Sequence, residues 1–211
     1  MSNTIHQKLK TKESLSKERI VRTAIEMIEE IGIDKFSLRK LAEKLNCEAM
    51  SIYYHVKNKD QIFDEIVDLL ISSIQFESDT LAMKQQLISV ARQWRFLAKT
   101  YPNFFPILAT HQLNTNVGSQ FMNQILMIFK KENLSIQQAS YFLRILNYYL
   151  IGAGVDETKG YRSGSSAVNP IKLDSNPNHY SLLVQAMPYW ADSHYDEIFE
   201  LGLEMLLAKM V

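Results

Sequence analysis

The 211-residue chain is poor in several features, and each shortage excludes a class of protein. Its one cysteine cannot form an internal disulfide, which argues against a stapled secreted scaffold and for a reducing compartment. No run approaches the roughly 18 apolar residues of a membrane span, and residues 1–15 lack the apolar stretch of a secretory signal. We therefore expect a cytoplasmic protein with no membrane partner, whose residues 1–15 form a mobile basic arm.

The chain also lacks net charge, because 23 Lys and Arg residues balance 23 Asp and Glu residues. Neutrality argues against a polycation that holds nucleic acid or membranes through bulk charge. The balance is nevertheless uneven along the chain. Residues 1–60 carry 12 basic and 9 acidic side chains, whereas residues 61–211 carry 11 and 14. An anionic partner is therefore expected at the N-terminal end.

Motifs of catalysis and metal binding are missing as well. The sequence has no glycine-rich phosphate loop, no His-Glu-x-x-His and no cysteine pair. Ser14/Lys17 and Ser37/Lys40 match Ser-x-x-Lys by chance, at helix starts and without the supporting motifs. Cys47 is interpreted as a small half-buried residue, with a redox role as the alternative. We expect no enzyme, no cofactor and no metal.

Helix signals run from one end to the other, so the predicted fold class is all-α. Ser16, Ser37 and Asn58 are N-cap candidates in front of amphipathic segments. Gly32 can end the first helix and Asn46 the second, since both tolerate positive φ. A third, short helix covers about 48–54. Further helices are expected at about 80–100, 103–111, 117–132, 135–158, 179–187 and 192–210, with cap signals at Ser135 and Ser193.

The segment from Phe36 to Lys59 predicts a helix-turn-helix, at about 37–56, whose second helix can enter the major groove. Ala49 and Met50 offer apolar surface to a thymine methyl, whereas the cationic groups that follow fit phosphates. The alternative is a plain three-helix packing unit with solvated charges. The candidate DNA-binding residues are Ser37, Arg39, Ala49, Met50, Ser51, Tyr53, His55, Lys57 and Lys59.

The run S-I-Y-Y-H-V-K-N-K-D-Q-I at 51–62, with S-L-R-K-L-A at 37–42, resembles the helix-turn-helix of the tetracycline-repressor family of bacterial regulators. The match covers about residues 14–74. By position it implies that Ser37 and Arg39 contact DNA, that Ala49, Met50, Ser51 and Tyr53 face bases, and that His55 and Lys59 face the backbone. Departures at Ala49 and Met50 mean that a relative's operator cannot be transferred to this chain.

The C-terminal half resembles the same family more weakly, through F-E-L-G-L-E-M-L-L at 199–207 and the apolar segment 135–158. In that family these two helices form a four-helix dimer interface, which implies a homodimer reading a palindromic operator in double-stranded DNA. The dimer residues expected on this basis are Ile145, Tyr149, Phe199, Leu203 and Leu206.

Arg144 and Asn147 lie inside the apolar run of 135–158, and buried polar groups need partners, so they either bond across a dimer or face a cavity. The aromatic residues nearby either line that cavity or are plain core. The subgroup of that family which the chain resembles holds its drug through a bound magnesium, and His111 and Asp156 lie in the corresponding regions, but the residues around them match too poorly to assign a metal. The candidate ligand-binding residues are Trp94, Tyr101, Phe105, His111, Phe121, Tyr141, Arg144, Asn147 and Tyr148.

Together these expectations describe an arm at 1–15, a DNA-binding domain at 16–60, a connecting helix at 61–78, and a ligand-binding and dimerisation domain at 79–211. A long loop rich in Gly, Ser, Asn and Pro, at about 160–178, is expected to be mobile. The implied function is a regulator, most simply a repressor, that a small-molecule effector of unknown identity releases from DNA. The alternative is a helical ligand-sequestering or adaptor protein without specific DNA binding.

Overall fold

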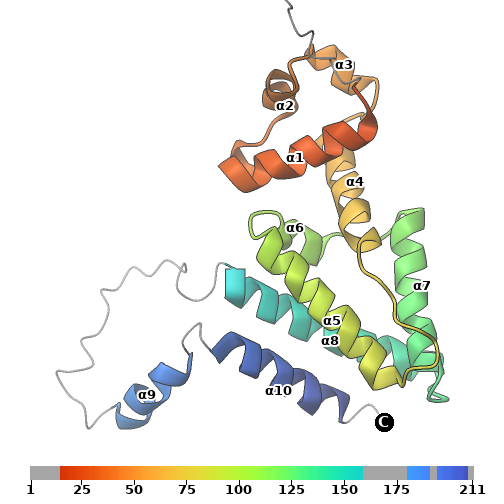
Figure 1. The fold of residues 1–211 in the computed structure, drawn as a ribbon, viewed down its shortest axis with the longest axis vertical. Helices are drawn as coiled ribbons and strands as arrows, with labels where there is room; N and C mark the ends of the chain where they lie inside the picture. Colours follow the sequence, from red (N-terminus) through yellow and green to blue (C-terminus); the bar gives the residue numbers. More distant parts are fainter. Residues whose placement is uncertain (1–14, 159–179, 191–193, 209–211) are drawn as a thin grey trace, which may run out of the picture. The chain divides into compact units, whose positions relative to one another are not determined.

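The computed structural model describes residues 15–158, 180–190 and 194–208, and every regular element within those ranges is helical (Figure 1). The all-α prediction is confirmed. Contacts divide the chain into two compact units, residues 1–66 and 67–211. In the described part of the chain, no helix is long and apolar enough to cross a membrane. The predicted arm, the loop at 160–178 and the cap at Ser193 lie outside the described residues.

The first unit begins with the predicted capped helices. Helix α1 (Lys17–Ile31) follows Ser16, whose side chain accepts a hydrogen bond from the Arg19 amide at 3.2 Å. After the short 3-10 helix η1 (Ile33–Lys35), helix α2 (Leu38–Leu45) is capped in the same way by Ser37. Asn46 then takes the left-handed conformation, φ 53° and ψ 50°, which lets the chain reverse direction. These local predictions are confirmed.

Helix α3 (Ala49–Tyr53) is only five residues long, and its one buried residue is Ile52. Ile52 is fully buried, as are Ile20 and Ile28 of α1 and Leu41 of α2. Burying such a side chain contributes about 1.5–3 kcal/mol, which a helix too short to be stable alone needs. Because Ile52 fixes the inward face, the remaining residues of α3 point away from the core.

Helix α4 (Lys59–Ser72) begins with a capping-box-like exchange. The Asn58 side chain accepts from the Gln61 amide at 2.9 Å, and the Gln61 side chain accepts from the Lys57 amide at 2.7 Å. The helix ends at Ser72, earlier than the predicted connecting helix. Past that point, the Gln75 amide donates to the Gln93 side chain at 2.7 Å, so the chain leaves the helix to run along α5.

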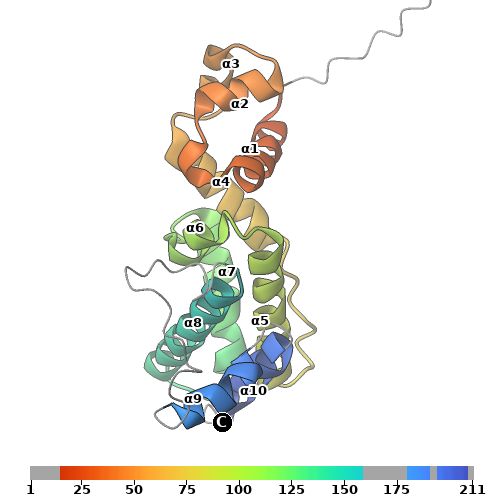
Figure 2. The ribbon, with the colours of Figure 1, turned by 90° about the vertical axis from the view of Figure 1, so that its left-hand side faces the viewer.

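In the second unit the helices are α5 (Met83–Thr100), α6 (Phe105–Thr110), α7 (Asn116–Lys130), α8 (Ile136–Thr158), α9 (Ser181–Ala186) and α10 (Tyr195–Leu207), with η4 (Met187–Trp190) after α9. Helix α8 packs against α5, α6, α7 and α10 (Figures 1 and 2). The predicted reciprocal cap of α8 by Ser135 and Gln138 is present. Pro188, expected to end the short helix, lies instead inside η4.

Two glycines let helices of this unit approach closely. A Cβ on Gly154 of α8 would lie 2.3 Å from the ring of Phe105, and one on Gly202 of α10 would lie 2.3 Å from the hydroxyl of Tyr149. Phe105 and Tyr149 therefore fill the space that a larger residue at either glycine would need. Both contacts help to define the cavities described below.

Candidate functional site

The outward face of α3 carries the predicted base-reading residues. Met50 is 62% exposed and Tyr53 is 48% exposed, Ala49 is exposed, and Ser51 is half-buried. Sequence reasoning missed Tyr54, which is 85% exposed directly after the helix. Its signal was the spacing from Ile52, because side chains one and two positions further along a helix do not share its buried face. The face offers apolar atoms and hydroxyls, but no arginine, lysine or amide for bidentate base contacts.

Helix α2 brings two further candidates to the same unit. The hydroxyl of Ser37 already caps α2, so its structural role is local. Arg39 is 87% exposed, and its guanidinium lies 3.3 Å from the carboxylate of Glu43 one turn later. An exposed pair of this kind is worth about 0.3–0.5 kcal/mol, so a phosphate or a guanine edge could readily replace Glu43.

The three basic candidates after α3 are placed differently from one another. Lys57 is exposed and His55 is half-buried. Lys59, predicted to face phosphates, is half-buried: its ammonium donates to the carbonyl of Ile33 at 3.4 Å and lies 5.6 and 5.2 Å from the ring centroids of Phe36 and Phe63. Cation–π attraction and the backbone acceptor hold it there. Lys57 is thus the better candidate for a phosphate contact.

The second unit contains a cavity of about 800 Å³, here called the main cavity. Its walls come from α5, α7, α8 and the segment from Leu108 to Asn114. Leucine, isoleucine and aromatic side chains predominate, which is usual for a small-molecule site. Six of the predicted ligand-binding residues line it: Trp94, His111, Phe121, Arg144, Asn147 and Tyr148.

The other three predicted ligand residues do not line the main cavity. Phe105 is fully buried and meets Trp94 edge-on, with ring centroids 6.3 Å apart, because Gly154 opens space for it. Tyr141 is 60% exposed and accepts a hydrogen bond from Gln137 at 2.9 Å. Tyr101 is half-buried at the end of α5. Phe105 belongs to the core behind the cavity wall.

Two donor groups characterise the wall of the main cavity. Arg144 is exposed, and its Nε donates to the hydroxyl of Tyr148 at 3.0 Å while its guanidinium lies 5.3 Å from that ring's centroid. Trp94 is 7% exposed, and its buried indole N–H has no hydrogen-bond partner among the described residues. A buried donor without a partner costs about 1–3 kcal/mol, so a ligand that accepts from it would recover that cost.

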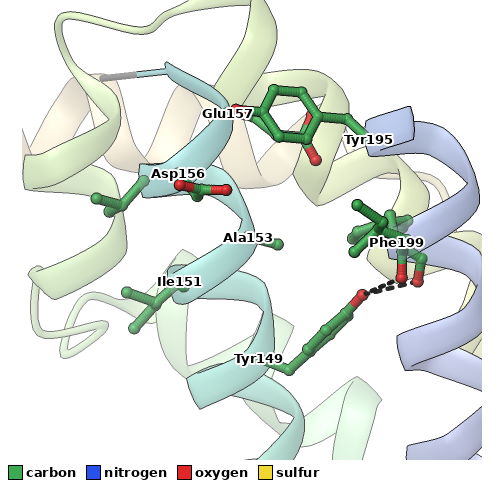
Figure 3. A pocket seen from close by; sticks show the side chains of 10 residues that line it. Tyr149, Ile151, Ala153, Asp156, Glu157, Tyr195 and Phe199 are labelled. Carbon is green, nitrogen blue, oxygen red and sulfur yellow. Dashed lines mark hydrogen bonds between the residues drawn. The ribbon is translucent and has the colours of Figure 1, made fainter. Parts of the chain in front are cut away.

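A second cavity of about 680 Å³ lies between α8 and α10 (Figure 3). We call it the α8–α10 cavity. The hydroxyl of Tyr149 crosses from α8 and donates to the carbonyl of Phe199 at 2.7 Å, and burial raises the pKa of Tyr149 to about 12. Asp156 and Glu157 also lie on its wall. Tyr149 therefore remains a neutral hydrogen-bond donor at physiological pH.

An ionic cluster that sequence reasoning missed joins α5, α8 and α10 beside this cavity. The guanidinium of Arg95 lies 2.7 Å from the carboxylate of Glu157 and 2.7 Å from that of Asp196, and it also lies 4.6 Å from the ring centroid of Phe199. Arg95 and Glu157 are 62 residues apart in the sequence, so no local spacing marks the pair.

The two residues considered for a magnesium ion lie in different cavities. His111 lines the main cavity, whereas Asp156 lines the α8–α10 cavity. Within the part of the chain that the structure describes, no group of three or more His, Cys, Asp or Glu side chains is placed to hold a metal ion.

Two of the predicted dimer residues belong instead to the core of one chain. Phe199 is 2% exposed and Leu203 is fully buried, because this face of α10 packs on α8 of the same chain. Tyr149 is engaged with Phe199, and Leu206 is half-buried. Ile145 is 42% exposed, which leaves it accessible to the partner contact that remains a prediction. The large apolar residues that α8 and α10 leave exposed are Ile136, Tyr141, Ile145, Tyr148, Val155, Ile198, Leu201 and Met205.

A helix-turn-helix unit joined to an all-helical unit with a cavity of ligand size defines a class of protein, the ligand-responsive DNA-binding transcriptional regulators. Residues 20–66 match the family described as "Bacterial regulatory proteins, tetR family", and residues 78–210 match "Tetracyclin repressor-like, C-terminal domain". The chain belongs to the tetR family.

Three known proteins illustrate the likeness. An HTH-type transcriptional regulator from Saccharopolyspora erythraea is 35% identical over 117 residues, or 54% of this chain and half of that protein. The class A tetracycline repressor from transposon 1721 of Escherichia coli is 24% identical over 92% of this chain and 89% of its own. The crystal structure of ActR from Streptomyces coelicolor in complex with actinorhodin shares the fold, with a TM-score of 0.75 and 22% identity over 93% of this chain and 97% of that one.

Proposed function

We propose that the chain is a homodimeric repressor that binds a palindromic operator and leaves it when a small molecule occupies the main cavity. The observation that carries this proposal is the placement of α3, where buried Ile52 holds the helix while Met50 and Tyr53 face outward. A recognition helix needs this division between an anchored face and a reading face. The name of the class A tetracycline repressor supports the sign of regulation.

The homodimer is supported by the apolar face that α8 and α10 leave uncovered. Ile198, Leu201 and Met205 recur at spacings of three and four, so they share one side of α10, and each is at least 45% exposed. Ile145 and Val155 add exposed apolar surface on α8. A twofold axis through such a face would pair it with itself, as an isologous interface requires.

The effector response is supported by a link between the cavity wall and α4. Phe121 and Ile125 of α7 line the main cavity, and Thr115 caps the start of α7. The hydroxyl of Thr115 donates to Asp68 of α4 at 2.6 Å. Helix α4 starts at Lys59, in the same unit as the recognition helix. A ligand that favours one position of α7 would therefore bias α4, by as much as its affinities for the two states differ.

A regulator of this kind works where the chromosome is, so we place it in the cytoplasm and assign it no catalytic activity. The test is binding of the purified chain to DNA upstream of its own gene, followed by fluorescence anisotropy over a series of salt concentrations. We expect a palindrome bound in preference to shuffled DNA, with affinity falling steeply as salt rises. Equal binding to both DNAs would overturn the proposal.

The alternative, a sequestering or adaptor protein, makes a different prediction for a double variant. Tyr53→Ala with Lys57→Ala removes an exposed hydroxyl and an exposed cation without touching the core. The regulator should lose operator affinity while its oligomeric state and folding stability stay unchanged. A matched control, Lys84→Ala on α5 of the second unit, should leave operator binding intact. If the parent and the double variant both bind DNA weakly and without sequence preference, the alternative is favoured.

A further inference from the structure

The charges on the wall of the main cavity are one-sided. Among the described residues that line the main cavity, Arg144 carries a permanent positive charge. None of those residues is an aspartate or a glutamate. No carboxylate faces Arg144 in the described structure: its Nε contacts the hydroxyl of Tyr148, and its guanidinium lies over that ring. Among the residues that the structure describes, the cation at the cavity therefore has no counter-charge.

The hydrogen-bonding groups of the wall show the same bias toward donors. The indole N–H of Trp94 can only donate, and it is buried without a partner among the described residues. The guanidinium of Arg144 likewise has donors and no acceptor. The other polar side chains of the described wall can both donate and accept: Thr110, His111, Gln112, Asn114, Ser140, Asn147 and Tyr148. The described wall thus holds two side chains that can only donate and no nitrogen- or oxygen-bearing side chain that can only accept, which favours acceptor oxygens on a ligand.

The α8–α10 cavity provides a contrast within the same unit. Asp156 and Glu157 lie on its wall, and no arginine or lysine is among the described residues that line it. Glu157 is held by Arg95 at 2.7 Å. The charged side chains on the described walls of the two cavities therefore differ in sign, which favours an anion in the main cavity.

We propose that the main cavity selects an apolar, aromatic small molecule that carries an anionic oxygen group such as a carboxylate or a phenolate. Arg144 supplies the counter-charge, Trp94 donates to an acceptor oxygen, and the leucine, isoleucine and phenylalanine walls take the ring system. This inference rests on the proposed function, because it gives the chemical class of the effector that the proposed repressor would sense.

The experiment uses three probes of one shape: 2-naphthoate, neutral 2-naphthamide and cationic 2-naphthylmethylammonium. The chain has two tryptophans, and Trp190 is 60% exposed, so W190F leaves Trp94 as the reporter of cavity occupancy. Quenching of Trp94 fluorescence, checked by calorimetry, gives each affinity. Because a charged hydrogen bond is stronger than a neutral one, we expect naphthoate to bind about tenfold more tightly than naphthamide and the ammonium to bind most weakly.

Two arginine variants test the assignment of the charge. R144Q should abolish the preference for naphthoate while changing naphthamide affinity by less than about threefold. R92Q removes an arginine of α5 that pairs with Glu200 and does not line the cavity, so the preference should survive. Absence of naphthoate binding, equal or tighter binding of the ammonium, or a preference that persists in R144Q would overturn the inference. Operator binding, measured separately on W190F, tests the proposed function alone.

Discussion

Thr115 and Asp68 are joined by one short hydrogen bond, in which the Thr115 hydroxyl donates to the Asp68 carboxylate at 2.6 Å. The same hydroxyl accepts from the Gly118 amide at 2.9 Å and so caps α7. One oxygen thus orders the helix that lines the main cavity and attaches it to α4. The link is a direct polar contact between two residues that lie 47 positions apart in the sequence.

Thr115→Val should therefore lose two interactions at once. The cap is worth about 1 kcal/mol and the hydrogen bond to a carboxylate about 1.5–3 kcal/mol, so we expect the free energy of unfolding to fall by about 2.5–4 kcal/mol. Thr115→Ser keeps the hydroxyl and should stay within about 1 kcal/mol of the parent. Urea denaturation followed by circular dichroism gives both values. A loss in Thr115→Ser as large as that in Thr115→Val would show that the hydroxyl alone does not account for the stabilisation.

Met50 gives a prediction about the DNA. Its exposed, apolar side chain on α3 is suited to thymine methyl groups, and removing a buried methyl costs about 0.8 kcal/mol, or about fourfold in affinity. Replacing thymine by deoxyuridine at one operator position at a time should find positions with this loss. In Met50→Ala, one of those positions should become insensitive to the replacement. Anisotropy at fixed salt measures it, and an unaltered thymine profile in the variant would contradict the assignment.

The capped helices of the first unit were predictable because their signals are local. Ser16, Ser37 and Asn46 lie next to the turns they make, and the structure places them as predicted. The roles of Phe199 and Leu203 were not predictable in this way. Periodicity shows that a helix face is apolar, but not whether the same chain or a second copy covers it; here α8 of the same chain covers both.

The lining of the main cavity could likewise not be predicted from sequence patterns alone. Phe105 and Trp94 are both aromatic residues in the right region, yet only Trp94 lines the main cavity, because Gly154 lets the ring of Phe105 pack into the core. Lys59 was predicted to meet phosphates from its charge and its position in the family motif, but the rings of Phe36 and Phe63 lie within reach of its flexible side chain. Both outcomes depend on contacts between residues distant in the sequence.

Glu157 and Glu200 allow a matched comparison of buried and exposed ion pairs. Side chains of the Arg95–Glu157 pair are 11% and 6% exposed, whereas those of Arg92–Glu200 are 60% and 40% exposed. Glu157→Gln should lower the free energy of unfolding by about 3 kcal/mol, since it leaves a buried guanidinium partly unpaired. Glu200→Gln should cost less than about 1 kcal/mol. Thermal and urea unfolding provide the values; similar losses would show that burial does not govern these pairs.

The stability of the protein in acid should depend on the carboxylates that pair with Arg95 and Arg92. The hydrogen bond from Arg95 holds the pKa of Asp196 below its ordinary value, and the one from Arg92 does the same for Glu200. The unfolded chain therefore binds protons more readily, so this stabilisation is present above the ordinary carboxyl pKa and is lost as pH falls through the folded pKa. The stability difference between the parent and D196N/E200Q should shrink from about pH 5 to about pH 3. A constant difference across that range, in urea titrations, would rule out this linkage.

Variants of Leu201 and Phe199, both on α10, should distinguish a loss of dimerisation from a loss of folding stability. Leu201 is 55% exposed and Phe199 is 2% exposed, although both are apolar and only two residues apart. Leu201→Glu places a charge on the proposed twofold interface and should yield a folded monomer in sedimentation velocity, with operator affinity reduced because one half-site is lost. Phe199→Ala should instead lower the free energy of unfolding by about 3–5 kcal/mol through a core cavity. Glu204→Gln, on an exposed position of the same helix, is the control for a surface change. If the Leu201→Glu protein remains dimeric, the dimer interface does not include this face of α10.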